Sequence, residues 1–341
     1  MDKGLIPLLE KAFRCQVYAV RPKRNVHLLK TDRGHWILKG YKNAEKAKWV
    51  TELAQVLREK GFFRTVQYVT DREGAKVFPY ADRYYTIMKL IDGKESDHAS
   101  LQDVKKSAET LAHFHLAARG FPFPYAAFDA PPAVLDKWES RLEYFERICW
   151  SIHRNGPQNR LEALILQIED EVVRDAREFL RLAYKLPLAA EMYAALNNGT
   201  LAHRDVASHN FLLTPRGECY LIDLDTVGHD WQLVDLVQLI SRMLLMQEYR
   251  LESFLEAVDS YSTVNPLSDT QVWMIHQMLR YPDNVMREIT GLYGNRPGYH
   301  LRGVLQLVQM EARLMRRRSE LLRAGERIFL RSPWGKYHFV G

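Results

Sequence analysis

The spacing of apolar residues changes character along the chain at about residue 92. Residues 16–40 contain short runs of β-branched and aromatic residues separated by turn-forming positions, which predicts antiparallel strands. In residues 44–60 the apolar side chains recur at three- and four-residue steps, which predicts an amphipathic helix. Two further strand-like runs follow, over residues 64–71 and 76–93. The first part of the chain therefore has the order strands, helix, strands.

Helical periodicity dominates after residue 93. Helices are predicted over residues 100–119, 134–153, 160–186 and from 231 to about 325. Residues 120–133 are rich in Pro and Gly and predict a loop, and two short apolar runs around a Pro-Arg-Gly-Glu turn predict a β-hairpin within residues 200–226. The pattern predicts an α+β fold with two lobes. Residues 1–92 would form a small sheet-plus-helix lobe, and residues 93–341 a larger, mostly helical lobe, with a ligand cleft between them.

Composition and charge narrow the setting of the protein. The chain has 341 residues, 47% of them hydrophobic, which is enough for a sizeable core, and no apolar run approaches the ~20 residues of a membrane span. The N-terminus does not read as a signal peptide, and Cys15, Cys149 and Cys219 are too far apart for a disulfide framework, which favours synthesis in the cytoplasm.

The formal net charge of +6 is mild and does not favour nucleic-acid binding. The densest basic cluster lies between Arg313 and Arg327 and is interleaved with Leu and Met. We interpret it as the solvated face of an amphipathic C-terminal helix, with lipid or nucleic-acid binding as the alternatives.

The segment around the predicted hairpin carries the most informative chemistry. Asp205 follows a short apolar run within His-Arg-Asp, Asn210 lies five residues later, and Asp223 ends the second strand of the hairpin. Phosphoryl transfer needs a carboxylate that orients the attacking hydroxyl and accepts its proton, and oxygen ligands that hold magnesium against the phosphates. Because the hairpin brings its two ends together, the spacing Asp-x4-Asn-x12-Asp predicts such a site.

This constellation resembles the Brenner motif of the protein-kinase-like superfamily, which protein kinases share with aminoglycoside phosphotransferases and choline kinases. The resemblance implies a protein-kinase-like fold, use of ATP and Mg²⁺, Asp205 as the catalytic base, and Asn210 and Asp223 as metal ligands. The sequence Ile-Asp-Leu-Asp stands where protein kinases have Asp-Phe-Gly, so Asp225 would be a second carboxylate near the metal. Asp235 resembles the aspartate that braces the catalytic loop in those families.

The N-terminal lobe offers partial matches to the same superfamily. Lys39 is in the place of the phosphate-anchoring lysine, and Glu52, or alternatively Glu45, would be the helical glutamate that orients it. The strand that contains Met88 and Leu90 resembles the hinge whose backbone groups bind adenine.

One stretch departs from the superfamily pattern. Kinases cover the phosphates with a glycine-rich loop, but residues 18–27 contain no glycine and instead carry Arg21, Lys23 and Arg24. This difference leaves weak nucleotide binding, or none, as an alternative.

The histidines do not predict a metal site. His113 and His115 are two residues apart on a predicted helix and point to different faces, so we interpret them as ordinary surface or core residues. His203 would have a structural role in the catalytic loop.

The C-terminal half adds a second resemblance, which covers roughly residues 15–320. The run from Tyr261 to Ser268, the later Leu-Arg-Tyr-Pro-Asp run at residues 279–283, and the catalytic-loop variant Asp-Val-Ala-Ser-His-Asn are similar to spore-coat kinase-like proteins of endospore-forming bacteria, of the CotS type and its YutH-like branch. The resemblance implies synthesis in the mother cell, location in the spore coat, and coat proteins as partners.

Three functional hypotheses follow. The first is an ATP- and Mg²⁺-dependent phosphotransferase with a coat protein or a small hydroxyl compound as acceptor. The second is a catalytically weak or inactive kinase-fold scaffold of the coat, and the third is a metabolic small-molecule kinase of the choline or homoserine type. For the last, an aromatic acceptor site among Tyr144, Phe145, Trp150 and Tyr249 is conceivable, although aromatic residues at helical spacing are more often core.

Overall fold

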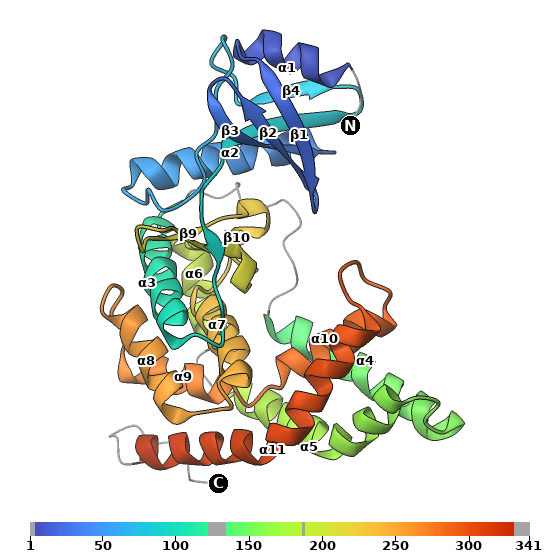
Figure 1. Ribbon diagram of the computed structural model, residues 1–341. Helices are drawn as coiled ribbons and strands as arrows, with labels where there is room; N and C mark the ends of the chain where they lie inside the picture. The colour runs from blue at the N-terminus through green and yellow to red at the C-terminus, as the bar shows by residue number, and fades with distance from the viewer. Residues whose placement is uncertain (1–3, 122–133, 186–187, 331–341) are drawn as a thin grey trace.

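A computed structural model describes residues 4–121, 134–185 and 188–330 (Figure 1). The N-terminal part contains a five-stranded antiparallel sheet with strand order β1-β2-β3-β5-β4. Its strands are β1 (Val17–Lys23), β2 (Val26–Thr31), β3 (Gly34–Tyr41), β4 (Val77–Tyr80) and β5 (Arg83–Lys89). The central position of β3 is what carries Lys39 into the interior, where the residue is only 7% exposed.

A helix packs on each face of this sheet. The helix α1 (Leu5–Phe13) places Leu5, Leu9 and Phe13 in one apolar cluster with sheet residues, and these three residues lie at four-residue steps on a single helix face. The helix α2 (Ala44–Glu59), capped by the Asn43 side chain, packs on the other side and joins the large core of the molecule. The sequence pattern had not predicted α1, although its four-residue spacing of apolar side chains was visible.

The strand predicted over residues 64–71 is wrong. This segment forms only an isolated bridge between Tyr68 and Met88, flanked by hydrogen bonds from Val69 N–H to the Ile87 carbonyl and from Lys89 N–H to the Gln67 carbonyl. Its alternating apolar residues pack against β5 but do not form a regular ladder of hydrogen bonds. The alternating pattern in the sequence therefore reflects the burial of these side chains and not a strand.

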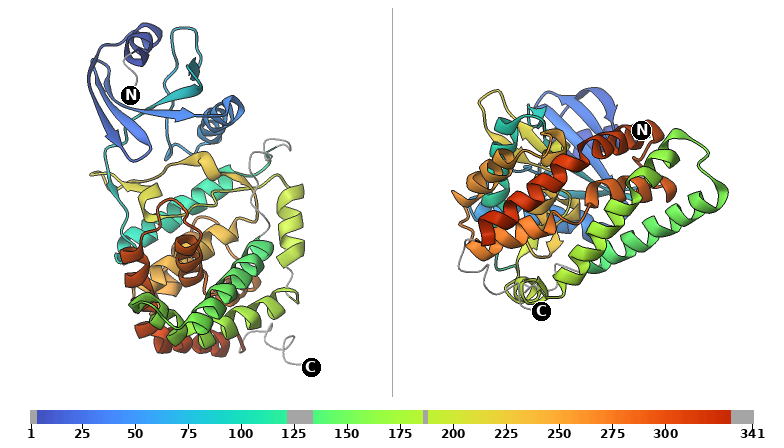
Figure 2. Two further views of the ribbon diagram at one scale, coloured as in Figure 1. Left: turned by 90° about the vertical axis from the view of Figure 1, so that its right-hand side faces the viewer. Right: turned by 90° about the horizontal axis from the view of Figure 1, so that it is seen from below.

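The rest of the chain is mainly helical. The helices are α3 (Leu101–Ala117), α4 (Val134–Asn155), α5 (Arg160–Ala183), α6 (Leu188–Asn197), α7 (Leu233–Met246), α8 (Leu251–Ser262), α9 (Asp269–Met278), α10 (Asp283–Tyr293) and α11 (Leu301–Leu330). In Figure 1 they lie below the sheet, and Figure 2 shows α11 running across the underside. Together with the sheet they form the predicted two-lobed α+β fold. The predicted loop over residues 120–133 falls almost entirely outside the described residues.

The helix α7 is the central element of the helical lobe. It contacts α3, α8, α9, α10 and α11, and Leu236, Leu239, Ile240 and Met243 are fully buried. A helix that is apolar on nearly all sides is stable only in such a surrounded position. The polar residues that α7 carries, among them Asp235, Gln238 and Arg242, are therefore held in fixed places.

Short strands surround the predicted hairpin. The strands β8 (Phe211–Leu213) and β9 (Cys219–Leu221) form the hairpin, and β6 (Lys94–Glu95) adds to its edge. The strands β7 (Leu201–Ala202) and β10 (Gly228–His229) pair separately and enclose the segment that carries the candidate site. The hairpin is thus where the sequence predicted it.

The C-terminal basic cluster is not a uniformly solvated face. Arg318 is only 4% exposed, and its guanidinium donates to Asp175 and to the main-chain carbonyls of Leu279 and Arg280. Arg316 is exposed and pairs with Glu320 one turn away. The side chain of Arg327 lies outside the described residues. The interpretation as an exposed basic face is therefore wrong for Arg318, because that position of α11 faces α5 and the end of α9. None of the described helices is long and apolar enough to cross a membrane.

Candidate active site

Side chains near the start of α7 accept hydrogen bonds from the main chain of the catalytic loop, defined here as residues 203–210. The carboxylate of Asp235 accepts hydrogen bonds from the main-chain N–H groups of His203 (2.5 Å) and Arg204 (2.8 Å). The Gln238 side chain accepts another from Val206 N–H at 2.7 Å. Arg204 has a φ of 69°, a strained conformation for a residue other than glycine, which these bonds maintain. Asp235 therefore lies where the resemblance placed a brace.

A buried hydrogen-bonded chain extends from this brace toward the molecular surface. His115 Nε2 lies 3.0 Å from Asp235 Oδ2, and His115 Nδ1 lies 2.7 Å from the Tyr261 hydroxyl. The Asn265 amide donates to that hydroxyl, and Arg119 donates to the Asn265 carbonyl oxygen, both at 2.8 Å.

The protonation states of His115 and Asp235 indicate which group donates each hydrogen bond along this chain. Burial lowers the pKa of His115 despite the neighbouring Asp235, so the ring is neutral at pH 7. For Asp235, burial acts to raise the pKa, but the hydrogen bond from His115 and the adjacent N–H groups hold it below its usual value. A neutral ring with its proton on Nε2 donates to Asp235 and accepts from Tyr261. The interpretation of His115 as an ordinary surface or core residue did not include this arrangement. Its position four residues after Leu111, on the same face of the helix, could have indicated that the side chain is buried.

Asp205 lies at the open end of the catalytic loop, with its side chain 42% exposed. The Asn210 side-chain amide donates to the Asp205 main-chain oxygen (2.9 Å) and to its carboxylate (3.3 Å). Arg242 Nη2 is 3.8 Å from the Asp205 carboxylate. Since the Asn210 nitrogen is committed to Asp205, its side-chain oxygen remains available, and no described residue donates to it.

Asp223 and Asp225 converge on Lys39 from across the lobes. Lys39 Nζ is 2.8 Å from Asp223 Oδ1 and 2.9 Å from Asp225 Oδ1, and the Tyr41 hydroxyl donates to Asp225 at 3.1 Å. Burial acts to raise the pKa of Asp223, but Lys39 outweighs it and holds the pKa below its usual value. Asp223 itself has a left-handed backbone with φ 61°, a strain typical of functional positions.

This donor set fits a divalent cation. Asp223 and Asp225 offer carboxylate oxygens and Asn210 an amide oxygen, which are the hard ligands that magnesium prefers, and the metal would keep several waters. Within the described ranges, three or more His, Cys, Asp or Glu side chains do not gather anywhere into a metal cluster. A site of two carboxylates with an amide therefore suits a cation shared with a nucleotide rather than an all-protein cage.

The predicted helical glutamate is not beside Lys39. Glu52 and Glu45 are both exposed on α2, and Glu45 lies 3.6 Å from Lys48. The buried face of α2 carries apolar residues such as Val50 and Leu53 instead. In this structure Asp225 supplies the second negative charge at Lys39. The sequence could not show this, because the partner comes from a segment almost 200 residues away.

The hinge residues lie at the end of the central strand pair. Met88 is buried and pairs with Ile37 in β3, and the Leu90 N–H donates to the His35 carbonyl at 2.9 Å. Both residues are thus at the junction of the lobes. Because the Leu90 N–H already donates to the His35 carbonyl, it is not available to an adenine ring. Adenine binding by this segment stays a prediction and would use neighbouring backbone groups.

The glycine-free stretch forms the β1–β2 hairpin. Arg24 at its tip has φ 50° and lies 3.1 Å from Glu95 of β6. Lys23 and Arg21 belong to β1, on exposed positions. The hairpin therefore reaches across to the helical lobe through a charge pair rather than through bare backbone.

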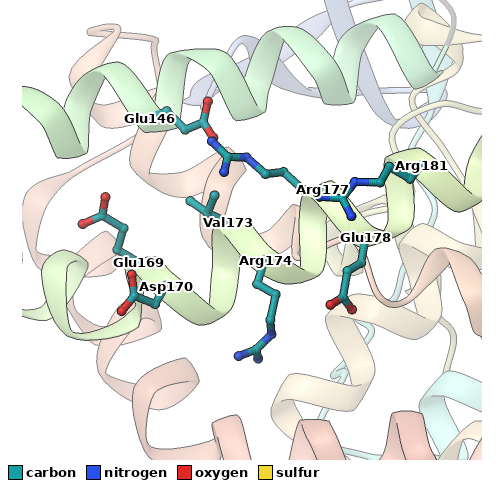
Figure 3. Close-up of a pocket in the computed structure, with 8 residues that line it drawn as sticks. All are labelled: Glu146, Glu169, Asp170, Val173, Arg174, Arg177, Glu178 and Arg181. Atoms are coloured by element: carbon teal, nitrogen blue, oxygen red, sulfur yellow. The ribbon is translucent and has the colours of Figure 1, made fainter.

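Two cavities bear on where an acceptor could bind. One, of about 520 Å³, opens beside Asp205. Another, of about 540 Å³, lies along α4 and α5 and is lined by charged side chains such as Glu146 and Arg177, which pair at 2.6 Å (Figure 3). The second cavity contains none of the predicted site residues. The aromatic residues considered for a cation-binding acceptor site, Tyr144, Phe145, Trp150 and Tyr249, line neither cavity.

A two-lobed fold with a braced catalytic loop, and with carboxylates and a lysine meeting between the lobes, defines a kinase-like phosphotransferase. Residues 23–267 match a family described as "Phosphotransferase enzyme family". Because this range is more than half of the sequence, the chain belongs to that family.

Individual relatives agree with this assignment. Spore coat protein S of Bacillus subtilis (strain 168) is 23% identical over 271 residues, which cover 76% of this chain and 74% of the relative. An aminoglycoside phosphotransferase structure from Alicyclobacillus acidocaldarius subsp. acidocaldarius matches with a TM-score of 0.83 at 19% identity, over 96% of both chains. A spectinomycin phosphotransferase in complex with ADP and spectinomycin matches with a TM-score of 0.65 at 12% identity, over 96% of this chain and 98% of that one. The structural matches establish the shared fold, and the predicted resemblance to spore-coat and aminoglycoside-kinase proteins is confirmed.

Proposed function

We propose that this protein is an ATP- and Mg²⁺-dependent phosphotransferase that acts on a hydroxyl acceptor and associates with the spore coat. The observation that carries the proposal is the meeting of Lys39 with Asp223 and Asp225. The Asn210–Asp205 pair is joined to this group through Ile222, whose N–H donates to the Asn210 main-chain carbonyl at 2.9 Å. These are the groups that phosphoryl transfer requires, and they come from both lobes. The similarity to Spore coat protein S supports the coat setting.

The chain's own residues would act in distinct ways. Asp205, oriented by Asn210, accepts the proton of the acceptor hydroxyl. Lys39 contacts phosphate oxygens and offsets their charge. Asp223, Asp225 and the Asn210 oxygen would hold Mg²⁺, which when bound neutralises charge on the phosphates. The Asp235 brace keeps the catalytic loop in its strained conformation, so that Asp205 does not have to reorganise.

The test is nucleotide binding by wild type and by Asp223→Asn. Asparagine tolerates the left-handed backbone at this position and removes only the charge. We expect Mg-ATP to raise the melting temperature of the wild type and to bind Asp223→Asn at least about tenfold more weakly, because a charge-assisted contact is lost. The matched control is Asp82→Asn in the exposed β4–β5 turn, which should bind like wild type.

A second candidate function is a coat scaffold without turnover. It is favoured by the glycine-free β1–β2 hairpin and by the engagement of Lys39 with both aspartates. If the wild type binds no Mg-ATP at millimolar concentration, the phosphotransferase proposal fails and the scaffold remains.

A further inference from the structure

The cavity beside Asp205 is the part of the site that the phosphotransfer machinery leaves unexplained. It is formed by the catalytic loop together with α4, α7, α10 and the segment 297–299, and its volume of about 520 Å³ suits a small molecule. Asp205 lies in its wall. If the protein transfers a phosphoryl group, this is the place from which the acceptor hydroxyl reaches Asp205.

The charges in this cavity do not balance locally. Of its acidic residues, Asp283 accepts a hydrogen bond from Arg141, and Glu288 accepts one from Arg287 at 3.1 Å. The remaining carboxylate is that of Asp205, which the reaction itself uses. Arg242 has only that carboxylate as an ion-pair partner, at 3.8 Å, and Lys137 has none among the described residues. Asp283 also attracts Lys137 and Arg242, but Arg141 already pairs with it, so the basic side chains of the wall and of its direct partners outnumber the carboxylates.

Donor groups in the cavity wall are also unsatisfied. Arg242 Nε and Nη1 and Arg287 Nη1 are buried and have no hydrogen-bond partner among the described residues. The Arg242 and Arg287 side chains are only 15% and 18% exposed. Buried guanidinium N–H groups without partners are costly, and a ligand that accepts their hydrogen bonds would relieve that cost.

The environment disfavours the cationic forms when the cavity holds no anion. Burial, and then Arg287, lower the pKa of Arg242 to about 10. Burial, and then Arg141, lower the pKa of Lys137. An anion in the cavity would act against both shifts, as the nearby carboxylate of Asp283 already does, whereas a cationic acceptor would add to the repulsion.

We propose that the acceptor is a small hydroxyl compound that also carries an oxyanion group, either a carboxylate or a phosphate. Arg242 and Lys137 would bind this oxyanion. The inference rests on the proposed function. Arginine matches the geometry of both oxyanions. In the transfer step the acceptor oxygen forms a bond to the γ-phosphorus of the nucleoside triphosphate, and the bond from that phosphorus to the β–γ bridging oxygen breaks. The hydroxyl proton passes to Asp205. The products are the nucleoside diphosphate and a phosphate monoester that keeps the original oxyanion.

The binding test uses inorganic phosphate as the probe for the oxyanion subsite. The protein is saturated with Mg-AMP-PNP so that the nucleotide's own phosphate site is filled, and phosphate is titrated by calorimetry into wild type, Arg242→Gln and Lys137→Gln. We expect each variant to lose about tenfold or more in phosphate affinity, since a charge-assisted bond is removed. The control Arg316→Gln, at an exposed position on α11, should match wild type. The melting temperature of each variant shows whether it is folded. If Arg242→Gln does not fold, Lys137→Gln alone tests the oxyanion site.

The turnover test compares four compounds that share a hydroxyl group and differ in charge: glycerate, glycerol 3-phosphate, glycerol and choline. The readout is acceptor-dependent formation of ADP. We expect activity with glycerate or glycerol 3-phosphate to exceed that with glycerol or choline, and the better of the two distinguishes a carboxylate from a phosphate.

The failures of the two proposals can be told apart. Activity that is highest with choline or glycerol, or phosphate binding that Arg242→Gln and Lys137→Gln leave unchanged, overturns the oxyanion inference while the phosphotransferase proposal stands. If no Mg-nucleotide binds, the proposed function fails. In that case phosphate is titrated into the nucleotide-free wild type and into Arg242→Gln. Weaker binding to the variant supports an oxyanion site in the cavity, and equal binding overturns it.

Discussion

At the scale of single residues, the site depends on a few ionisable side chains whose surroundings set their charge. Lys39 and Asp223 hold each other in the charged state in spite of burial, and His115 stays neutral beside Asp235 because burial dominates. His98, in the cavity beside Asp205, is a further case. Burial and then Arg242 lower its pKa to about 4, so it is neutral at pH 7.

His98 makes stability depend on pH. Its pKa in the folded state is about 4, below the ordinary 6.5, so the unfolded chain binds the proton more readily. Its contribution is present above pH 6.5 and is lost as pH falls toward 4. We expect His98→Gln to reduce the loss of unfolding free energy between about pH 7 and about pH 5 by about 1–2 kcal/mol, measured by urea denaturation. The control His300→Gln, at an exposed position, should retain the wild-type pH dependence, and an identical slope in both variants would contradict the prediction.

At the scale of elements, the catalytic loop is positioned by side chains of three helices that pack beneath it. The chain of hydrogen bonds from Asp235 through His115 and Tyr261 to Asn265 connects α7, α3 and α8. Ser268 then begins α9 with a capping box. The tyrosine and the Pro-Leu-Ser turn that marked the resemblance to coat proteins thus lie at the outer end of the brace. In the sequence they were only a recurring pattern, and the fold gives them a mechanical role.

Tyr261→Phe should weaken this brace. The change leaves His115 Nδ1 and the Asn265 amide without their shared partner in a buried place, which we expect to cost about 1–3 kcal/mol of unfolding free energy. If the protein turns over, kcat should fall while the KM for nucleotide changes little, because Asp205 is displaced and Lys39 is not. The matched control is Tyr281→Phe, a buried tyrosine whose hydroxyl donates to the Trp138 carbonyl away from the loop. It should lose stability without the change in kcat, and equal kinetic effects in the two variants would refute the brace.

At the scale of the whole molecule, the two lobes share an apolar core through α2, and a few polar contacts add to it. Lys39 and Tyr41 on β3 reach Asp223 and Asp225, and Arg24 at the tip of the β1–β2 hairpin reaches Glu95. The chain crosses between the lobes near residues 90–93, where we predict the boundary between the two domains. A cluster of charges that joins two lobes can set their relative orientation, because it is lost as a unit when one member is removed.

Lys39→Met should therefore loosen the lobes as well as weaken nucleotide binding. It leaves two neighbouring carboxylates without their cation, which raises the pKa of Asp223 and favours separation. We expect faster tryptic cleavage near Lys89 and Lys94 than in wild type, and at least about tenfold weaker Mg-ATP binding. Lys48→Met, at an exposed position of α2, is the control. Unchanged cleavage with weakened binding would show that Lys39 serves the nucleotide but not the lobe contact.

The sequence by itself determined the fold class and the hairpin on which the predicted site residues lie. The switch from strand to helix periodicity, the hairpin at residues 211–221, and the spacing of Asp205, Asn210 and Asp223 are local features, so a single segment of chain is enough to read them. What failed was of another kind: residues 64–71 form no regular strand, Glu52 is exposed on α2, and Arg318 is buried. The interpretation of His115 as a surface or core residue was right, but it did not show that His115 belongs to the brace.

Each of these depends on contacts between segments far apart in the chain, which decide which face of a helix is covered and which charges meet. Only the tertiary structure could show that Asp225 pairs with Lys39, and that Lys137, Arg242 and Arg287 gather in the cavity beside Asp205. Burial sets both the protonation state and the cost of an unpaired donor, and burial is a property of the packed molecule rather than of the sequence.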